Sequence, residues 1–321
     1  MTEPLSLPVF RKISRIVDGM GLRAYVIGGY VRDYYLCRPC TDIDVVVVGS
    51  GIDVAEALAR ETGSNVTVFK TFGTAMLRTE GMEVEFVGAR KESYSRDSRK
   101  PVVEAGTLRD DQLRRDFTIN ALAWSLNGDT FGELEDPFGG MEDMREHIIR
   151  TPCDPDITFS DDPLRMMRAV RFAAQLGFDI APETFEAIER NRERIRIVSR
   201  ERIITEINKI VLSPVPSIGF ELMDMTGLLP LVFPEMSRLK GVEKVGLHGH
   251  KDNFTHTLKV LDNVALNSDS LWLRWAAILH DIGKPATKAY DPAAGWTFHG
   301  HEVVGARMVP DIFRRMKLPL N

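Results

Sequence analysis

The first half of the chain alternates short apolar runs of strand period with amphipathic stretches of helix period. Residues 9–20 and 54–60 predict helices. Five runs bounded by turn residues predict strands, at residues 24–27, 43–48, 65–69, 74–79 and 82–87. A further strand-like run lies at 130–136. This order of elements predicts a mixed-sheet domain of the α+β class.

The pattern turns helical from Asp110, and beyond about residue 150 helix follows helix without an alternating strand run. We therefore expect a sheet-based head over 1–150. Prolines at 214 and 216 and Gly227 interrupt the helices and predict a neck over 151–226 and a body over 227–321. The body ends without a capping helix, and we expect it to be incomplete. Residues 90–108 lack apolar periodicity and predict a mobile loop.

Composition and charge exclude several classes of protein. The 321 residues are 44% hydrophobic and 27% charged, which is typical of a globular chain and not of a disordered one. The net charge of −5 means that a polyanion needs a local basic surface, and residues 165–202 supply one with nine arginines and no lysine. Three cysteines and no long apolar run predict a cytoplasmic protein without a membrane segment.

Candidate chemistry begins at Asp42 and Asp44, which lie at the start of a valine-rich strand. Side chains alternate along a strand, so both carboxylates point to one face and offer the hard oxygen ligands that Mg²⁺ prefers. Upstream, Gly28 and Gly29 separate a strand from a helical stretch, where bare backbone N–H groups can approach a polyphosphate, and Arg32 adds a cation. Taken alone, two aspartates at a strand end are most often simply solvated, and a glycine pair is most often a simple turn. The combination of the two motifs is unusual.

Five ordered blocks extend this pattern along nearly the whole chain. The blocks are 28–33 with Asp42 and Asp44, then 114–121, 136–140, 161–172 and 199–202. Together they resemble the class II tRNA nucleotidyltransferases (CCA-adding enzymes) and bacterial poly(A) polymerases, a family of the polymerase-β-like superfamily. The resemblance implies an α+β head followed by an all-helical neck and body.

The resemblance assigns catalysis to the head. It implies that Asp42 and Asp44 bind the catalytic Mg²⁺ and that Glu85 is the third acid, although Glu83 shares its face and either residue fits. It also implies that Arg115, at the start of an expected helix, binds the incoming nucleotide and that Asn120 helps to shape the sugar site. An arginine pair at 114 and 115 beside acidic residues is by itself more often a surface feature.

The neck block implies recognition of the nucleobase by protein side chains. We expect a helix beginning near Pro163, on which Arg165, Arg168 and Arg171 recur every three residues. By resemblance, Asp162 and Arg165 contact the base, while Arg168 and Arg171 hold phosphate or orient Asp162. The family usually has Glu-Asp where this chain has two aspartates, which leaves the contact of the first acid open. A salt-bridged amphipathic helix is the alternative.

The C-terminal region is rich in histidine. Its His256, His280, Asp281 and His301 resemble the HD domain, in which spaced ligands hold divalent metals for phosphohydrolase chemistry. The last acidic ligand of complete HD domains is not found before residue 321. A second divalent-metal site and a purely structural helix bundle therefore both remain open.

These features predict a template-independent enzyme that adds CMP and AMP from CTP and ATP to the 3′ end of tRNA. Enzymes that add only CC or only A, and poly(A) polymerases, share the same acids and remain alternatives. An HD-type phosphohydrolase whose head only binds RNA is an alternative from another class, and a catalytically idle RNA-binding module is a third. The sequence indicates no oligomeric state.

Overall fold

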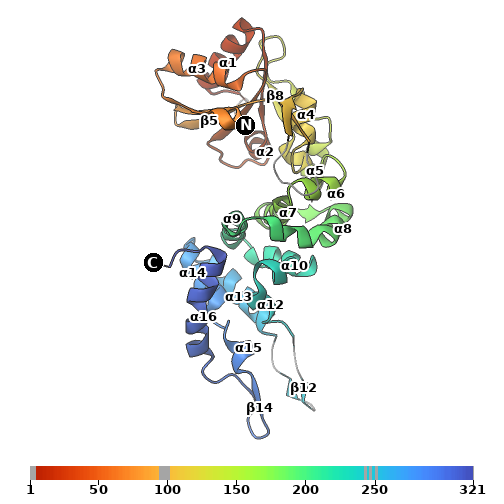
Figure 1. Cartoon of the computed structure of the whole chain (residues 1–321), viewed down its shortest axis with the longest axis vertical. Coiled ribbons are helices and arrows are strands. Elements are labelled where there is room, and N and C mark those ends of the chain that lie inside the picture. Colours follow the sequence, from red (N-terminus) through yellow and green to blue (C-terminus); the bar gives the residue numbers. More distant parts are fainter. Residues whose placement is uncertain (1–4, 94–101, 242–243, 246–247, 250–251, 321) are drawn as a thin grey trace. The chain divides into compact units, whose positions relative to one another are not determined.

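In the computed structural model the chain divides into two compact units, Met1–Asp154 and Pro155–Asn321 (Figure 1). The structure describes all residues except 1–4, 94–101, 242–243, 246–247, 250–251 and 321. None of the helices in the described residues has the length and apolar run that crossing a lipid bilayer requires.

The first unit is built on a seven-stranded mixed sheet. In spatial order its strands are β3 (Val66–Phe69), β4 (Thr74–Thr79), β5 (Met82–Gly88), β2 (Asp42–Val48), β1 (Arg23–Ile27), β8 (Ala123–Ser125) and β9 (Leu134–Glu135). Strands β2 and β5 run parallel, and the other neighbours run antiparallel. The predicted mixed-sheet head is confirmed.

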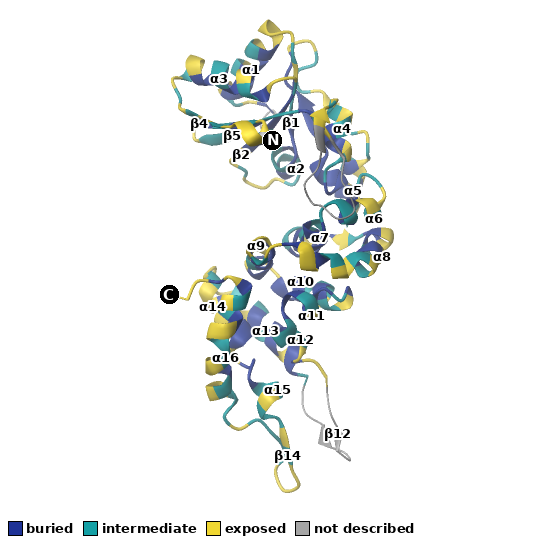
Figure 2. Ribbon diagram, viewed as in Figure 1, coloured by how far each residue is buried: buried dark blue, intermediate teal, exposed yellow. Residues whose placement is uncertain are grey.

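The two faces of this sheet have different roles. Helices α1 (Pro8–Gly19) and α3 (Gly51–Thr62) pack on one face, where Val26, Val45 and Phe86 are fully buried (Figure 2). The alternate residues of β2 and β5 point to the opposite face and include Asp42, Asp44 and the two glutamates of β5. At the start of these strands, alternating polar and apolar residues thus separate the core from the polar face, whereas farther along β2 the same face carries the buried Val46.

Shorter elements border the polar face and the ends of the sheet. They are α2 (Gly29–Tyr35), η1 (Lys70–Phe72), α4 (Leu108–Leu113), η2 (Thr118–Asn120), α5 (Gly140–Glu146) and β10 (Ile148–Ile149). Leu108 of α4 packs against a buried cluster that includes Ile27, Val46 and Ala123. Helix α4 therefore lies on the polar face of the sheet, directly before the arginine pair.

The structure corrects three local predictions in the first unit. Within the predicted loop 90–108, β6 (Arg90–Ser93) and β7 (Val102–Ala105) form an antiparallel pair. Strand pairing uses backbone hydrogen bonds and does not require apolar periodicity. Residues 94–101 lie outside the described residues. Of the run 130–136, only Leu134–Glu135 is a strand, since turn hydrogen bonds take up the residues before it. Strand β8 was expected to be helical, but tertiary pairing with β1 makes it extended.

The second unit is mainly helical. Its first helices are α6 (Pro155–Asp161), α7 (Leu164–Leu176), α8 (Pro182–Asn191), η3 (Arg192–Ile197), α9 (Arg200–Val211), α10 (Pro216–Met225), α11 (Leu229–Val232) and α12 (Pro234–Ser237). The later helices are α13 (Asn253–Ala265), α14 (Leu271–Leu279), α15 (Lys284–Thr287) and α16 (His301–Met316). Five short strands accompany them: β11 (Asp179–Ile180), β12 (Lys244–Val245), β13 (His248–Gly249), β14 (Ala289–Asp291) and β15 (Gly295–Thr297).

One buried core joins the helices of the second unit. Helix α9 contacts α7, α14 and α16, and α10 contacts α7 and α13. The contacts are made by the apolar faces that the helix period predicts, with Val170, Ile207, Phe220 and Trp275 almost fully buried (Figure 2). The predicted all-helical region is confirmed, apart from its short strands.

Candidate active site

The polar face of the sheet brings three predicted acids together on adjacent strands. In the parallel register of β2 and β5, Asp42 is paired with Glu83 and Asp44 with Glu85. Glu83 is bound by Arg78, with its Oε2 accepting from Nε at 2.8 Å. Glu85 is exposed, and the charge of Asp44 acts on it. Of the two glutamates left open by the sequence, Glu85 is therefore the one placed beside Asp44.

The electrostatics of these acids indicate a site for a cation. Burial raises the pKa of Asp44, and the neighbouring charges of Asp42 and Asp111 raise it further, while Arg115 opposes the shift. Glu85 is exposed, but neighbouring protein atoms partly desolvate its carboxylate and raise its pKa, and the charge of Asp44 adds to the effect. Carboxylates that burial and mutual repulsion destabilise as anions gain most from a bound cation.

Gly28 lies between these acids and the arginine pair. Its backbone has φ of 83° and precedes the first turn of α2, a conformation that residues with a Cβ rarely adopt. A Cβ at this position would lie 2.9 Å from Nη1 of Arg115 and 3.4 Å from Oδ2 of Asp44. The guanidinium of Arg115 and the carboxylate of Asp44 therefore both face the backbone of Gly28.

The arginine pair does not begin a helix as the sequence predicted. Helix α4 ends at Leu113, and Arg114 and Arg115 follow it directly. The apolar residues after them, Phe117 and Ile119, instead enter the core through the short turn η2. The prediction assigned their periodicity to a helix, whereas burial in the tertiary structure accounts for it.

Arg32 and Asn120 form a hydrogen-bonded network on one side of Gly28. Arg32 binds both carboxylate oxygens of Asp33 at 2.8 and 2.9 Å, and its Nη1 donates to Oδ1 of Asn120 at 2.7 Å. The amide nitrogen of Asn120 donates to Oδ1 of the buried Asp116 at 3.0 Å. Gly29 begins α2 beside this network, and a Cβ added at Gly29 would lie 3.7 Å from Nη2 of Arg32. Asn120 is thus held at both ends of its side chain.

The predicted base-recognition residues lie in the second unit, around the start of α7. Oδ1 of Asp162 accepts from the backbone N–H of Leu164 at 3.2 Å, and Oδ2 accepts from Nη2 of Arg202 at 2.9 Å. Arg202 belongs to α9, so two helices orient this carboxylate. Sequence reasoning placed Arg202 in a family block but gave it no role. The only signal in the sequence for such a role was that Arg202 lies in the first turn of the helix that follows Ser199.

The three arginines of α7 do not share one environment. Arg165 and Arg168 are partly exposed, whereas Arg171 is buried. Nε of Arg171 donates to Oε2 of the buried Glu206 at 2.5 Å, and its guanidinium lies 3.9 Å from the ring centre of Phe172. Residues three apart do not lie exactly above one another on a helix, so successive arginines point in different directions. Arg165 and Arg168 lie toward the surface, and Arg171 lies in the contact between α7 and α9. Arg171 is therefore placed to orient the helix.

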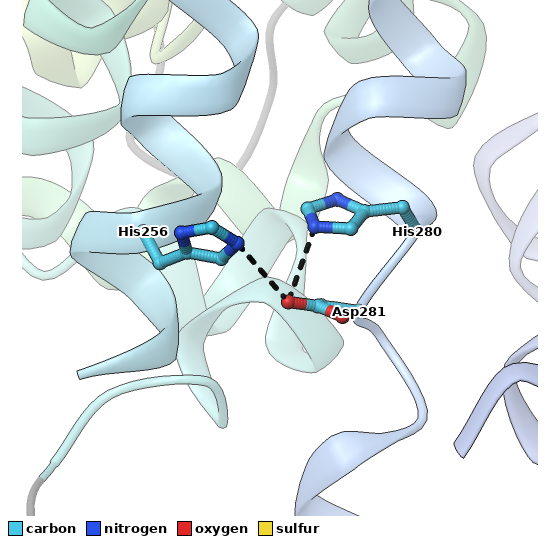
Figure 3. Close-up of side chains that lie close together, drawn as sticks. All are labelled: His256, His280 and Asp281. Carbon is cyan, nitrogen blue, oxygen red and sulfur yellow. Dashed lines mark ion pairs between the residues drawn. The ribbon is translucent and has the colours of Figure 1, made fainter. Parts of the chain in front are cut away.

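A second cluster of ligand-type side chains lies within the HD-like part of the second unit (Figure 3). Nε2 of His280 lies 3.1 Å from Oδ2 of Asp281, and Nε2 of His256 lies 3.6 Å from the same oxygen. One ligand atom each from His256, His280 and Asp281 lies within 4.8 Å of the others. His301 approaches the other oxygen of Asp281, at 3.4 Å. The structure thus brings together all four residues that the sequence singled out.

Hydrogen bonds at the far side of two rings orient this cluster. Nδ1 of His280 lies 2.7 Å from the carbonyl oxygen of Ala277, and Nδ1 of His301 lies 2.9 Å from that of Phe298. Because a carbonyl oxygen only accepts, Nδ1 carries the hydrogen in each ring and Nε2 is directed at Asp281. This arrangement is the one found behind metal-binding histidines. Lys284 provides a competing cation, with Nζ donating to Oδ2 of Asp281 at 2.7 Å.

Comparisons with family models divide the chain into three matched regions. Residues 24–150 match the poly A polymerase head domain, and residues 177–240 match the probable RNA and SrmB-binding site of polymerase A. Residues 253–320 match the HD domain. The acids of the polar face lie in the first region, and the histidine and aspartate cluster lies in the third.

Whole-chain comparisons agree with these matches. The chain is 36% identical over 311 residues to the multifunctional CCA protein of Pseudomonas fluorescens, covering 93% of this chain and 71% of that protein. It is 43% identical over 188 residues to the A-adding tRNA nucleotidyltransferase of Aquifex aeolicus, covering 58% of this chain and 23% of that protein. A solved tRNA nucleotidyltransferase, complexed with a primer tRNA and an incoming ATP analogue, superposes with a TM-score of 0.70 at 28% identity, covering 96% of this chain and 80% of that one.

Proposed function

The chain belongs to the family of tRNA nucleotidyltransferases that contains the CCA-adding enzymes, and we propose that it adds CMP and AMP to the 3′ end of tRNA with release of pyrophosphate. The observation that carries this proposal is the polar face of the sheet, where Asp42, Asp44 and Glu85 lie on adjacent strands and Arg115 faces Gly28. Nucleotidyl transfer requires chiefly this combination of acids for a metal and cations for a triphosphate.

Divalent metal dependence is a general property of this family, and the donor set of this site suits Mg²⁺ in particular. Asp42, Asp44 and Glu85 offer hard carboxylate oxygens, and mutual repulsion between Asp44 and its acidic neighbours favours a bound dication. Held by these three acids, Mg²⁺ would supply charge neutralisation at the triphosphate and would help the 3′ hydroxyl to act as a nucleophile. The role of the three acids is to hold and orient this ion.

The remaining residues of the first unit would bind the triphosphate. The backbone N–H of Gly28 donates to the carbonyl oxygen of Leu122 at 3.2 Å, so Gly29, at the start of α2, is the glycine whose N–H would meet a phosphate. Arg115 presents a guanidinium at the adjacent Gly28, where a planar fork suits phosphate oxygens. Arg32 holds Asn120 in place beside the same glycines, which supports a role for Asn120 in shaping the sugar site.

Selection of the base belongs to the start of α7. A carboxylate accepts from the exocyclic amino group that cytosine and adenine share, and an arginine donates to ring acceptors, so Asp162 and Arg165 suit these two bases. Arg202 holds the carboxylate of Asp162 in one orientation. Arg171 would support the helix from inside through Glu206, and the partly exposed Arg168 would bind phosphate.

A single-nucleotide activity is the second candidate. The 43% identity to an A-adding tRNA nucleotidyltransferase, over 58% of this chain, favours an enzyme that adds only the terminal A. Both activities would use the same acids and the same base-recognition pair. The difference between them would appear only in the products.

The decisive experiment supplies labelled CTP and ATP, separately and together, with tRNA ending at the discriminator base and with tRNA already ending in CC. Addition of two C and one A supports the CCA-adding reaction. Addition of A only to the CC-ended tRNA selects the A-adding enzyme, and addition of C alone selects a CC-adding enzyme. Long A tails select a poly(A) polymerase. The variant Asp42→Asn with Asp44→Asn should abolish every product, and incorporation that survives in it contradicts the assigned site.

The cluster around Asp281 supports a separate metal site. We propose that His256, His280, Asp281 and His301 bind a divalent transition metal, because their nitrogen and oxygen donors face one another with the histidine rings oriented from behind. Such a site would suit phosphoester hydrolysis. Calorimetric titration with Mn²⁺ or Ni²⁺ should give heat that His280→Ala loses. Equal heat in the two proteins would favour a structural helix bundle in which Lys284 neutralises Asp281.

We place the protein in the cytoplasm on chemical grounds. Its proposed substrate is tRNA, and Cys37, Cys40 and Cys153 are all free thiols. Free thiols are typical of a reducing compartment.

A further inference from the structure

One fully buried carboxylate lies behind the arginine pair of the first unit. The side chain of Asp111 is completely inaccessible to solvent and lies in α4, three and four residues before the two arginines. Its Oδ1 accepts from Nε of Arg114 at 3.0 Å and from Nη2 at 2.5 Å. Its Oδ2 accepts from Nε of Arg115 at 3.2 Å, with Nη2 also at 3.2 Å. Each oxygen of one carboxylate therefore binds a different arginine.

This contact determines which edge of Arg115 is available. Asp111 engages Nε and Nη2, and the third nitrogen, Nη1, faces Gly28. An unrestrained arginine side chain samples many rotamers, and fixing it before a ligand arrives lowers the cost of binding. The geometry thus leaves one edge of the guanidinium directed at the point that Gly28 and Asp44 share.

Helix α4 itself is anchored to the sheet, so Asp111 is a fixed point. Thr107 and Asp110 form a capping box at its start. Nε2 of Gln112 donates to the carbonyl oxygens of Ala121 and Glu135, at 2.7 and 3.2 Å. Leu108 packs on the buried cluster of the sheet. A carboxylate on such an element can transmit its position to Arg115.

We propose that Asp111 is a positioning residue for the incoming nucleotide, which holds Arg115 so that Nη1 meets the triphosphate at Gly28. This inference rests on the proposed nucleotidyl transfer. The charges agree with it, because the single negative charge of Asp111 does not neutralise both Arg114 and Arg115. Asp111 itself does not touch the nucleotide and acts through Arg115.

The test begins with Asp111→Asn, which keeps the shape but loses the charge and one acceptor oxygen. The KM for ATP and CTP should rise about tenfold or more, whereas kcat and the KM for tRNA should change less than about threefold, since ground-state nucleotide binding is what is weakened. A variant whose kcat falls while the nucleotide KM stays constant would overturn the proposal. Should this variant not fold, Asp111→Glu keeps the charge but displaces the carboxylate and should show the same selective rise; an unchanged nucleotide KM overturns the proposal.

A double-mutant cycle separates positioning from a merely structural role. If Asp111 acts through Arg115, adding Asp111→Asn to Arg115→Met should weaken nucleotide binding no further than Arg115→Met alone. Effects that multiply would show that Asp111 acts by another route. Asp143→Asn is the matched control, because Asp143 is also a buried acid of the first unit but binds Arg150 and Thr118 instead of Arg115. It should leave the nucleotide KM unchanged, and a KM rise equal to that of Asp111→Asn would make the effect one of general destabilisation.

Binding of ATP without tRNA distinguishes this proposal from the proposed function. If the wild-type protein binds ATP but incorporates no nucleotide, the proposed activity fails while the titration still tests Asp111. In that case a dissociation constant for ATP that Asp111→Asn leaves unchanged overturns the positioning role. A wild-type protein that binds no ATP overturns both.

Discussion

At the residue scale, the active face depends on a glycine whose conformation and neighbours both disfavour a side chain. Replacing Gly28 by alanine places a Cβ 2.9 Å from Nη1 of Arg115, on a backbone with φ of 83°. We expect nucleotide incorporation to fall by about tenfold or more. The guanidinium of Arg115 must shift away from the added Cβ, and groups that align a substrate tolerate only small displacements. Labelled CTP and ATP incorporation measures the effect.

Gly63→Ala is a control for the backbone strain in this experiment. Gly63 also has positive φ, 67°, at the end of α3, but a Cβ there has no neighbour within 4 Å. Gly63→Ala should lower the free energy of unfolding by about 1–2 kcal/mol, the cost of a left-handed helical conformation for an L-residue. Gly28→Ala should lower it by at least as much, because φ of 83° with ψ of −132° lies outside that region. Only Gly28→Ala should reduce activity when both proteins are folded. An equal loss of activity in the two variants would assign the effect to strain.

We expect Asp44 to lower the stability of the folded protein while it is required for activity. Burial raises its pKa above the value of 3.8 in the unfolded chain, so the folded protein binds a proton more tightly and the free energy of unfolding falls as pH rises through the interval between the two pKa values. Asp44→Asn should therefore melt at a higher temperature than the wild type at pH 7 in EDTA, and this gain should disappear below about pH 4. It should nevertheless be inactive.

The opposite dependence of the free energy of unfolding on pH is expected for an aspartate that forms a favourable ion pair. Hydrogen bonds from Arg190 lower the pKa of Asp156, so its stabilising effect is present above the unfolded pKa and is lost as pH falls through the folded one. Asp156→Asn should not raise the melting temperature at pH 7. A higher melting temperature in both variants would show that the cause is the removal of any acid and not the burial of Asp44.

At the element scale, the second unit depends on an arginine that joins helix ends. Arg274 of α14 is buried and donates from Nη1 to the carbonyl oxygens of Val211, the last residue of α9, and of Ser213, at 2.9 and 2.8 Å. Its Nη2 donates to Ala265, the last residue of α13, at 3.2 Å, and its Nε donates to Ser268 at 2.9 Å. Carbonyl groups in the last turn of a helix lack an N–H partner within that helix. One guanidinium therefore ties two helix termini to a third helix.

Arg274→Met should destabilise the second unit strongly. It leaves several buried carbonyl groups without donors, and each such group costs about 1–3 kcal/mol. We expect the free energy of unfolding to fall by at least about 3 kcal/mol in urea titrations followed by circular dichroism. Arg307→Met, at an exposed arginine of α16, is the control and should change it by less than about 0.5 kcal/mol. A loss below 1 kcal/mol for Arg274→Met would mean that water replaces these bonds.

At the scale of the whole molecule, the two proposed activities belong to different compact units. Asp42 lies in the first and His280 in the second. Asp42→Asn should reduce nucleotide incorporation by at least about 100-fold, because it removes charge stabilisation of the transition state, and should leave metal binding at the His280 cluster unchanged. His280→Ala should lose that metal binding and retain incorporation. Incorporation assays and calorimetry on both variants test this separation, and a joint loss in either variant would contradict it.

Much of the fold and of the candidate site could be predicted from local patterns. The alternation in β2 placed Asp42 and Asp44 on one face, and the helix period identified α1 and α3, because side-chain direction follows directly from backbone period. The order of the five motif blocks identified the family, since each block joins residues that are close in the chain. Such short-range relations are written in the sequence itself.

What the sequence left open depends on residues distant in the chain. Only the pairing of β2 with β5 showed that Glu85 lies beside Asp44 and Glu83 beside Asp42. Only the contact of α7 with α9 brought Arg202 to Asp162 and buried Arg171. Strand β8 was missed because pairing with β1 overrides its local preference. Asp111 gave no signal before its burial and its two arginines were known. Local period determines an element and its face, whereas register, burial and long-range partners are decided when elements pack together.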